Sequence, residues 1–211
     1  MDACRLCLTK SGIERIKGRD KRGYLLCPQC HIILAESKHF LTPEQEKARY
    51  SNHQNSINDK GYVDFLYKAI TPALHFLSKD AKCLDYGCGP GPTLSLLLAK
   101  EGFTCDNYDP FFHNEKLAPS FDAVFSTETF EHFRHPAEDI AKVAGLVRDG
   151  GHLVVMTEMW KTLEHFRNWY YPGDPTHVAF YHRTTFDYIA RKLGFAIEFS
   201  DGERVVIMQK S

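Results

Sequence analysis

The spacing of hydrophobic and polar residues predicts a regular alternation of strands and helices in most of this 211-residue chain. Short apolar runs, typical of strands, alternate with stretches whose apolar residues recur at helical spacing. The predicted strands span residues 81–86, 103–109, 121–126, 152–157, 195–200 and 204–209, and the predicted helices span residues 93–101, 136–147 and 184–193. This alternation favours an α/β fold with a parallel, doubly wound sheet. Asp201-Gly202 predicts that the last two strands form an antiparallel hairpin.

A different pattern precedes this core, over residues 41–80. Thr42-Pro43 has the residue types that begin a helix, and the apolar residues within 62–70 share one face of a second helix. Thr71-Pro72 should break or kink that helix, because proline lacks the N–H group that continues the ladder. We therefore expect a helical linker or cap ahead of a core over residues 81–211.

Cysteine spacing sets the first residues of the chain apart. Four of the seven cysteines form two Cys-x-x-Cys pairs: Cys4, Cys7, Cys27 and Cys30. Two such pairs can supply four thiolates to one tetrahedral zinc ion. The segment between the pairs is polar and has too few apolar residues to form a core, so it would need a cross-link such as a bound metal ion to fold. We predict a small zinc ribbon over residues 1–40, with free thiols or two disulfides as the alternatives, although disulfides do not suit a chain without a secretory signal.

Composition narrows the class of protein. The chain is 43% hydrophobic and 25% charged, which excludes a disordered or coiled-coil protein. No apolar run approaches the roughly 20 residues that span a bilayer, so we expect a cytoplasmic protein without a membrane partner. The net charge of −1 conceals an uneven distribution of charge along the chain, because residues 1–40 carry eight Lys/Arg against four Asp/Glu. A contact between this basic head and nucleic acid is therefore an alternative, although a solvated surface is favoured.

A glycine-rich loop, Asp85-Tyr86-Gly87-Cys88-Gly89-Pro90-Gly91, follows the first predicted strand of the core. Glycines let a ligand approach backbone N–H groups closely. Asp109 ends the next strand, where a carboxylate can accept hydrogen bonds from ribose hydroxyls. A dinucleotide would need a third glycine where the chain has Pro92, and Asp85 would repel its pyrophosphate. The pattern favours a cofactor with a sulfonium and an amino-acid tail instead.

Residues 84–91 closely resemble motif I of the class I S-adenosylmethionine-dependent methyltransferases, and residues 107–110, 121–132 and 148–153 resemble later motifs of that family in the same order. The resemblance covers about residues 60–211 and implies a Rossmann-like fold that binds S-adenosylmethionine. The cofactor-binding residues that it implies are Asp85, Gly87, Gly89, Gly91, Asp109 and Glu128.

One departure from the family concerns residues 110–120, where the family places a helix and a further strand. Eleven residues are too few for both, so we expect the edge strand to be missing and the sheet to have about six strands. The adenine pocket would then need another cover. Phe111, Phe112 or the segment over residues 50–62 could supply it.

The cysteine head ahead of this fold resembles bacterial sugar C-methyltransferases and related metabolite enzymes with a zinc-binding head. More loosely, it resembles a ribosomal-RNA guanine methyltransferase family with an N-terminal zinc finger. The first resemblance implies a small-molecule substrate and the second implies RNA.

Candidate catalytic groups follow the third strand of the core, in Glu128-x-x-Glu131-His132. Two carboxylates and an imidazole could bind a divalent cation, and the motif resembles that of ubiquinone-pathway O-methyltransferases, in which a metal assists. Alternatively, His132 is a general base, or Glu131 and His132 cap the next segment.

Residues 160–182 contain seven aromatic side chains, which suit the wall of a pocket for a planar or apolar molecule, the stacking of bases, or plain core. Within this segment, His177 is the best candidate for a base on the substrate side.

These observations predict in-line methyl transfer to an O or N acceptor of a small metabolite, with His177, His132 and Glu131 as candidate catalytic residues. An RNA methyltransferase that uses the basic head is the first alternative. A non-catalytic binding module, suggested by the short segment 110–120, is the second.

Overall fold

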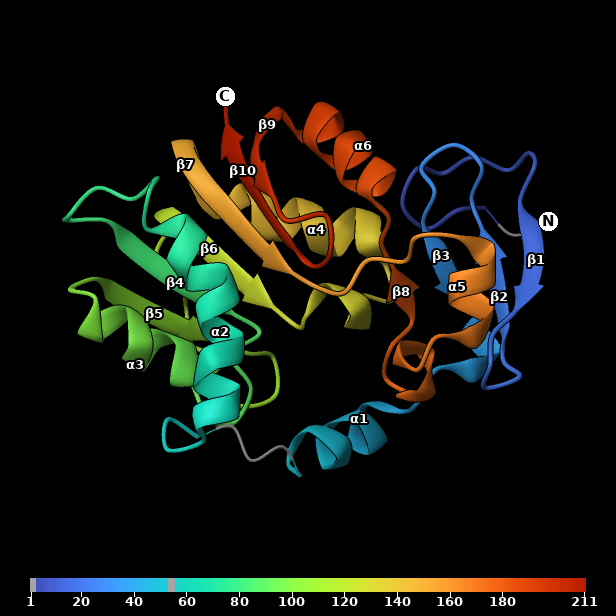
Figure 1. Ribbon diagram of the computed structural model, residues 1–211, viewed down its shortest axis with the longest axis horizontal. Helices are drawn as coiled ribbons and strands as arrows, with labels where there is room; N and C mark the ends of the chain where they lie inside the picture. The colour runs from blue at the N-terminus through green and yellow to red at the C-terminus, as the bar shows by residue number, and fades with distance from the viewer. Residues whose placement is uncertain (1–2, 53–55) are drawn as a thin grey trace.

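The computed structural model describes residues 3–52 and 56–211. Its central element is a six-stranded sheet with the order β5-β4-β6-β7-β10-β9 (Figure 1). The strands are β4 (Lys82–Tyr86), β5 (Thr104–Tyr108), β6 (Phe121–Thr127), β7 (Val147–Met156), β9 (Phe195–Ser200) and β10 (Val205–Lys210). The first four run parallel to one another, and β10 is antiparallel to both β7 and β9. The expected Rossmann-like, mostly parallel sheet with a C-terminal hairpin is confirmed.

The short connection after β5 leaves that strand at the edge of the sheet. Residues 109–120, all of which the structure describes, form no helix and no further strand beyond an isolated bridge between Asp109 and His113. The expected loss of the edge strand is therefore confirmed. The strand β7 begins earlier than the pattern predicted, because the backbone N–H of Phe121 donates to Leu146 and the pairing with β6 starts there.

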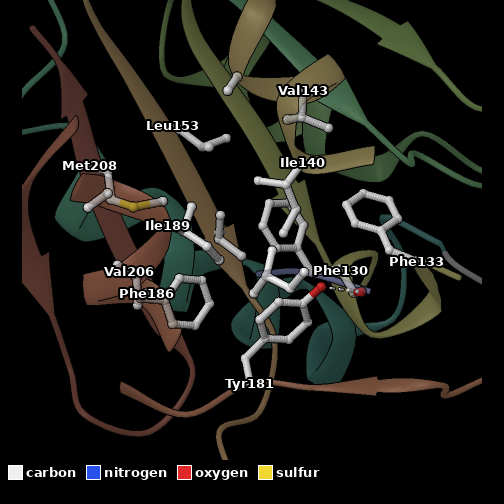
Figure 2. Packing of buried hydrophobic residues seen from close by; sticks show 14 of the residues in the cluster. Phe130, Phe133, Ile140, Val143, Leu153, Tyr181, Phe186, Ile189, Val206 and Met208 are labelled. Atoms are coloured by element: carbon white, nitrogen blue, oxygen red, sulfur yellow. Dashed lines mark hydrogen bonds between the residues drawn. The ribbon is translucent and has the colours of Figure 1, made fainter. Parts of the chain in front are cut away.

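Helices cover both faces of the sheet. On one face, α4 (Pro136–Gly145) and α6 (Arg183–Leu193) pack through Ile140, Val143, Phe186 and Ile189 against side chains such as Leu153 and Met208 (Figure 2). On the other face, α2 (Lys60–Ala73) and α3 (Thr93–Lys100) cover the alternate residues of the same strands. The helix α2 ends at Ala73, one residue after Pro72, which is close to the position at which Thr71-Pro72 was expected to break it.

The N-terminal head forms a second sheet, with the order β1-β2-β3-β8. Three of its strands, β1 (Glu14–Lys17), β2 (Gly23–Leu26) and β3 (Ile33–Ala35), come from the head itself. The fourth, β8 (Ala179–Phe180), comes from the far end of the chain and pairs with β3 through Leu34 and Ala179. The head therefore shares its sheet with the segment that carries His177.

Short helices connect the two sheets. The helix α1 (Pro43–Tyr50) begins with a capping box between Thr42 and Gln45, as the Thr42-Pro43 pair predicted. It lies beside the gap between the head and the core (Figure 1). The remaining short helices are α5 (Leu163–Asn168), η1 (Ser37–His39), η2 (Phe130–His132) and η3 (Tyr171–Gly173). Among the described residues, no helix is both long enough and apolar enough to cross a membrane.

Candidate active site

A cavity of about 590 Å³ opens at the carboxyl ends of β4, β5 and β6. This is the edge of a doubly wound sheet at which ligands bind. The glycine loop after β4 forms one side of the cavity, α1 and α2 contribute Tyr50, Tyr62 and Phe65, and η2 contributes Glu131 and His132. The cavity therefore joins segments from most of the chain around the predicted motifs.

Backbone geometry explains the glycines of the loop. Gly87 has a φ of 86° and Gly89 a φ of 64°, a region that L side chains rarely adopt. A Cβ atom on Gly87 would lie 2.2 Å from the Thr129 hydroxyl, so a larger residue would displace that loop. Gly87 and Gly89 line the cavity, whereas Gly91 is not among its lining residues.

Two carboxylates stand beside this loop. Asp85 lies in β4, one residue before its end, in a buried position, and its Oδ1 atom has no hydrogen-bond partner. Burial, together with the nearby charge of Asp109, raises the pKa of Asp85 to about 7. The carboxylate of Asp109 accepts hydrogen bonds from the backbone N–H groups of Gly89 (3.1 Å), Phe111 (2.8 Å) and Phe112 (3.2 Å). Asp109 therefore links the glycine loop to the turn after β5.

Glu128 follows β6 with a φ of 49°, an uncommon conformation for a residue other than glycine. Burial and the neighbouring Glu131 raise the pKa of Glu128 well above its ordinary value. The Tyr171 hydroxyl oxygen lies 3.2 Å from its Oε2 atom, and Arg204 lies 4.0 Å from its Oε1 atom. Glu128 lines the cavity.

The three predicted catalytic residues meet in one cluster. A carboxylate oxygen of Glu131 and one ring nitrogen each of His132 and His177 lie within 4.8 Å of one another. The rings of the two histidines are 5.0 Å apart, and the backbone N–H of Val178 donates to the carbonyl oxygen of Glu131. This hydrogen bond holds the two segments together. Glu128, which the sequence placed with Glu131 and His132, is not part of this cluster, and His177 takes its place.

Each member of the cluster is held by a second contact. Nδ1 of His132 lies 3.1 Å from the carbonyl oxygen of Thr176, and Nδ1 of His177 lies 2.8 Å from that of Tyr171. Because a carbonyl oxygen only accepts, each Nδ1 atom is the donor, so the neutral form of each ring has its lone pair on Nε2. Burial, and then the neighbouring His132, lower the pKa of His177 to about 4. His177 is therefore neutral at pH 7.

The aromatic segment over residues 160–182 does not form the wall of this cavity. Six of its seven aromatic side chains are buried, and they pack between the head and the core: Trp160, Phe166, Trp169, Tyr171, Phe180 and Tyr181. Tyr170 is exposed. The aromatic residues that do line the cavity come from α1, α2 and the loops, and they include Tyr50, Tyr62 and Phe111.

The segment over residues 50–62, named from the sequence as a possible cover, contributes Tyr50 and Tyr62 to the lining of the cavity, but the contacts that α1 makes there were not predicted. The Tyr50 ring packs against the ring of His132 at 5.2 Å and against that of Phe111 at 5.8 Å. Arg49 holds Asp174 in an ion pair at 2.7 Å. The polar sequence of α1 carries no signal for this position. Phe111 lines the cavity and Phe112 does not, and residues 53–55 of the expected cover lie outside the described residues.

The four head cysteines form one cluster, with their Sγ atoms within 4.8 Å of one another. Cys4 and Cys30 are 3.6 Å apart, and Cys7 and Cys27 are 3.4 Å apart. These distances exceed a disulfide bond of about 2 Å and are near the sulfur–sulfur separation of about 3.8 Å in a tetrahedral zinc site. The donor set therefore suits zinc.

Comparison with known families matches residues 61–198 to the family described as methyltransferase domain. No curated protein sequence matches the chain.

Solved structures share the fold. The magnesium protoporphyrin IX methyltransferase of Synechocystis PCC 6803, with bound S-adenosylhomocysteine, is 17% identical with a TM-score of 0.53, and the match covers 82% of this chain and 97% of that one. The 1,6-didemethyltoxoflavin-N1-methyltransferase of Burkholderia thailandensis, with its substrate and S-adenosylhomocysteine bound, is 14% identical with a TM-score of 0.55, covering 88% and 98%. An O-methyltransferase family protein of the same organism is 17% identical with a TM-score of 0.55, covering 79% and 63%.

Proposed function

Because this chain belongs to the methyltransferase domain family, whose members of this fold are class I S-adenosylmethionine-dependent enzymes, we propose that it methylates an O or N atom of a small metabolite. The observation that carries the proposal is the cavity itself. Its lining includes the glycine loop with Asp85 and Asp109, and it also includes Glu131, His132 and His177. A methyl donor and an acceptor can therefore meet inside one site.

The donor would lie along the glycine loop. Asp109 would accept hydrogen bonds from the ribose hydroxyls, and Phe111 would cover the adenine. Gly87 and Gly89 let the amino-acid tail approach the backbone, and the unpaired Asp85 carboxylate would attract its ammonium group. Glu128 lies at the end of β6 next to this position and would bind the same tail. The positive sulfonium suits a wall that carries several carboxylates.

Chemistry at the acceptor requires removal of a proton when the attacking group is a hydroxyl or an ammonium. The cluster of Glu131, His132 and His177 lies in the same cavity and offers two Nε2 lone pairs. His177 would hold the acceptor or take its proton, because burial keeps its imidazole neutral. In the transfer, the acceptor lone pair forms a bond to the methyl carbon while the bond to sulfur breaks, and S-adenosylhomocysteine leaves.

We also propose that Cys4, Cys7, Cys27 and Cys30 hold a structural zinc ion. With four thiolates the ion has no open position for a substrate, so its role would be to hold the head together. The ion would stabilise the strand β3, which pairs with β8 near His177. The head over residues 1–40 would then form part of the substrate side of the enzyme.

A metabolite substrate is favoured over RNA because two of the eight cationic side chains of the head are used inside the protein. Arg5 donates to the carbonyl oxygens of Ala35 and Arg134, and Arg22 donates to carbonyl oxygens of residues 172–177. The cavity also has the size and the aromatic lining of a small-molecule site. The structural relative from Burkholderia thailandensis that holds a small-molecule substrate agrees with this proposal.

Two measurements test the proposal. Calorimetry should show S-adenosylhomocysteine binding to the full chain, and the absence of binding would overturn the cofactor assignment. S-adenosylmethionine with a deuterated methyl group is then incubated with the enzyme and either a metabolite extract or total RNA. Label should appear in a small molecule. Label in RNA, together with RNA binding that weakens steeply with salt, would favour the alternative instead.

A further inference from the structure

The cluster of Glu131, His132 and His177 has the features of a metal site rather than of a single base. Its ligand atoms converge within 4.8 Å, so small side-chain rotations would bring them onto one ion at bond lengths of about 2.0–2.2 Å. Each histidine is fixed through Nδ1 by a backbone carbonyl oxygen, which orients Nε2 and sets its tautomer. This outer contact is the one that metal-binding histidines typically make.

The carboxylate of Glu131 shows the same arrangement. Its Oε1 atom accepts a hydrogen bond of 2.6 Å from the Tyr171 hydroxyl, while its Oε2 atom is buried and has no hydrogen-bond partner. Glu131 is fully buried, and it lines the cavity. A buried carboxylate oxygen without a partner is costly unless a cation or a donor satisfies it. The unpaired atom therefore indicates that something binds there.

We propose that Glu131 Oε2, His132 Nε2 and His177 Nε2 bind one divalent first-row transition-metal ion, which in turn binds the hydroxyl group of the methyl acceptor. This proposal rests on the proposed methyl transfer and adds the ligand set and the acceptor class to it, with the metal ion in place of His177 as the group that promotes loss of the acceptor proton. Two imidazoles with one carboxylate suit Mn²⁺, Fe²⁺, Co²⁺ or Zn²⁺, whereas Mg²⁺ and Ca²⁺ prefer oxygen ligands.

Glu128 is excluded from this ligand set by its own surroundings. Its carboxylate lies outside the cluster of converging ligand atoms, and the Arg204 guanidinium is 4.0 Å from its Oε1 atom, which like Glu131 Oε2 has no hydrogen-bond partner. A cationic side chain on that side opposes a second cation. The site therefore differs from the Glu128-Glu131-His132 set that the sequence suggested.

A metal ion at this position selects a hydroxyl over an amine as the acceptor. An amine has one lone pair, and coordination to the ion would remove the pair that must attack the methyl carbon. A hydroxyl that binds the ion loses its proton to water more readily, and the resulting oxyanion keeps further lone pairs. The oxygen then forms the bond to the methyl carbon, the carbon–sulfur bond breaks, and its electron pair stays on sulfur.

The test is a titration of the full chain with Mn²⁺. Binding is measured by electron paramagnetic resonance, as the loss of the signal of the free ion. Mn²⁺ prefers nitrogen and oxygen ligands to thiolates, so the cysteine cluster does not interfere. We expect one Mn²⁺ per chain. Binding should be at least about tenfold weaker in Glu131→Gln and His177→Asn, since changes in the outer shell alone cost about that much.

Matched controls separate this ligand set from its neighbours. Asp139→Asn and His135→Gln change an acid and an imidazole of the same cavity and should bind Mn²⁺ nearly as the wild type does. If Glu131→Gln fails to fold, His177→Asn and His132→Asn decide the result.

The proposal is overturned if the wild type binds no Mn²⁺, or if the ligand variants bind it as tightly as the wild type. Titration of the same samples with S-adenosylhomocysteine keeps the two proposals apart. Binding of S-adenosylhomocysteine without Mn²⁺ overturns the metal site alone, whereas Mn²⁺ binding without S-adenosylhomocysteine supports the metal site and overturns the proposed function.

Discussion

The guanidinium group of Arg22 donates a hydrogen bond to the carbonyl oxygen of His177 at 3.3 Å, although the two residues are 155 positions apart. The same group donates to the carbonyl oxygens of Pro172, Asp174 and Pro175. Asp20 pairs with Arg22 from within the head. A side chain of the head thus holds the loop that presents His177 to the cavity.

Replacement of Arg22 should loosen this loop. We expect Arg22→Ala to lower the free energy of unfolding by about 1–3 kcal/mol, because partly buried carbonyl oxygens lose a charged donor. Hydrogen–deuterium exchange should rise over residues 171–178, whereas Lys17→Ala, which removes an exposed cation of β1, should change neither quantity. Unchanged exchange in Arg22→Ala would contradict the positioning role.

Zinc removal should affect more than the head. Cys27→Ser, or a chelator, should release one zinc ion per chain, as elemental analysis would show, and should increase hydrogen exchange over residues 1–40 and over β8. The second effect follows because β8 pairs with β3. Cys105→Ser replaces a cysteine outside the cluster and should retain the metal. Equal zinc content in both variants would rule out the proposed ligands.

Loss of the Asp109 carboxylate should weaken cofactor binding. Asp109→Ala should reduce the affinity for S-adenosylhomocysteine by about tenfold or more. The ribose would lose its hydrogen-bond acceptor, and the backbone N–H of Gly89 in the glycine loop would lose its acceptor as well. Asp109→Asn keeps the side-chain size and should show a similar loss. Asp106→Asn alters an exposed carboxylate of the same strand, which pairs with Lys82, and is the control for calorimetry. The ribose assignment fails if Asp109→Ala binds as the wild type does.

Cofactor affinity should depend on pH through Asp85. Burial raises the pKa of Asp85 to about 7 in the free protein, and a bound cation would lower it by favouring the charged form. Binding therefore releases a proton below pH 7, so the affinity is full above that value and falls as the pH decreases. We expect it to be about tenfold lower at pH 6 than at pH 8.

Calorimetry of the wild type and of Asp85→Asn at several pH values checks this dependence. The variant should bind more weakly, and this part of the pH dependence should disappear. The same slope in both proteins would mean that another group titrates.

Local patterns determined the core of this protein. Short apolar runs predicted the strands of the central sheet, and the short stretch over residues 110–120 predicted the missing edge strand. The positions of Asp85 and Asp109 followed from the same reasoning, because the carboxyl ends of parallel strands meet at one edge. These features depend on neighbours in sequence and on general rules of sheet topology.

Tertiary structure decided the substrate side. An aromatic residue has the same appearance in a sequence whether it lines a cavity or fills a core, so the burial of Trp169 and Phe180 could not be predicted. The meeting of His177 with Glu131 and His132, and the bonds from Arg22, join residues far apart along the chain. Such pairings depend on how β8 docks against the head, and no local spacing encodes that contact.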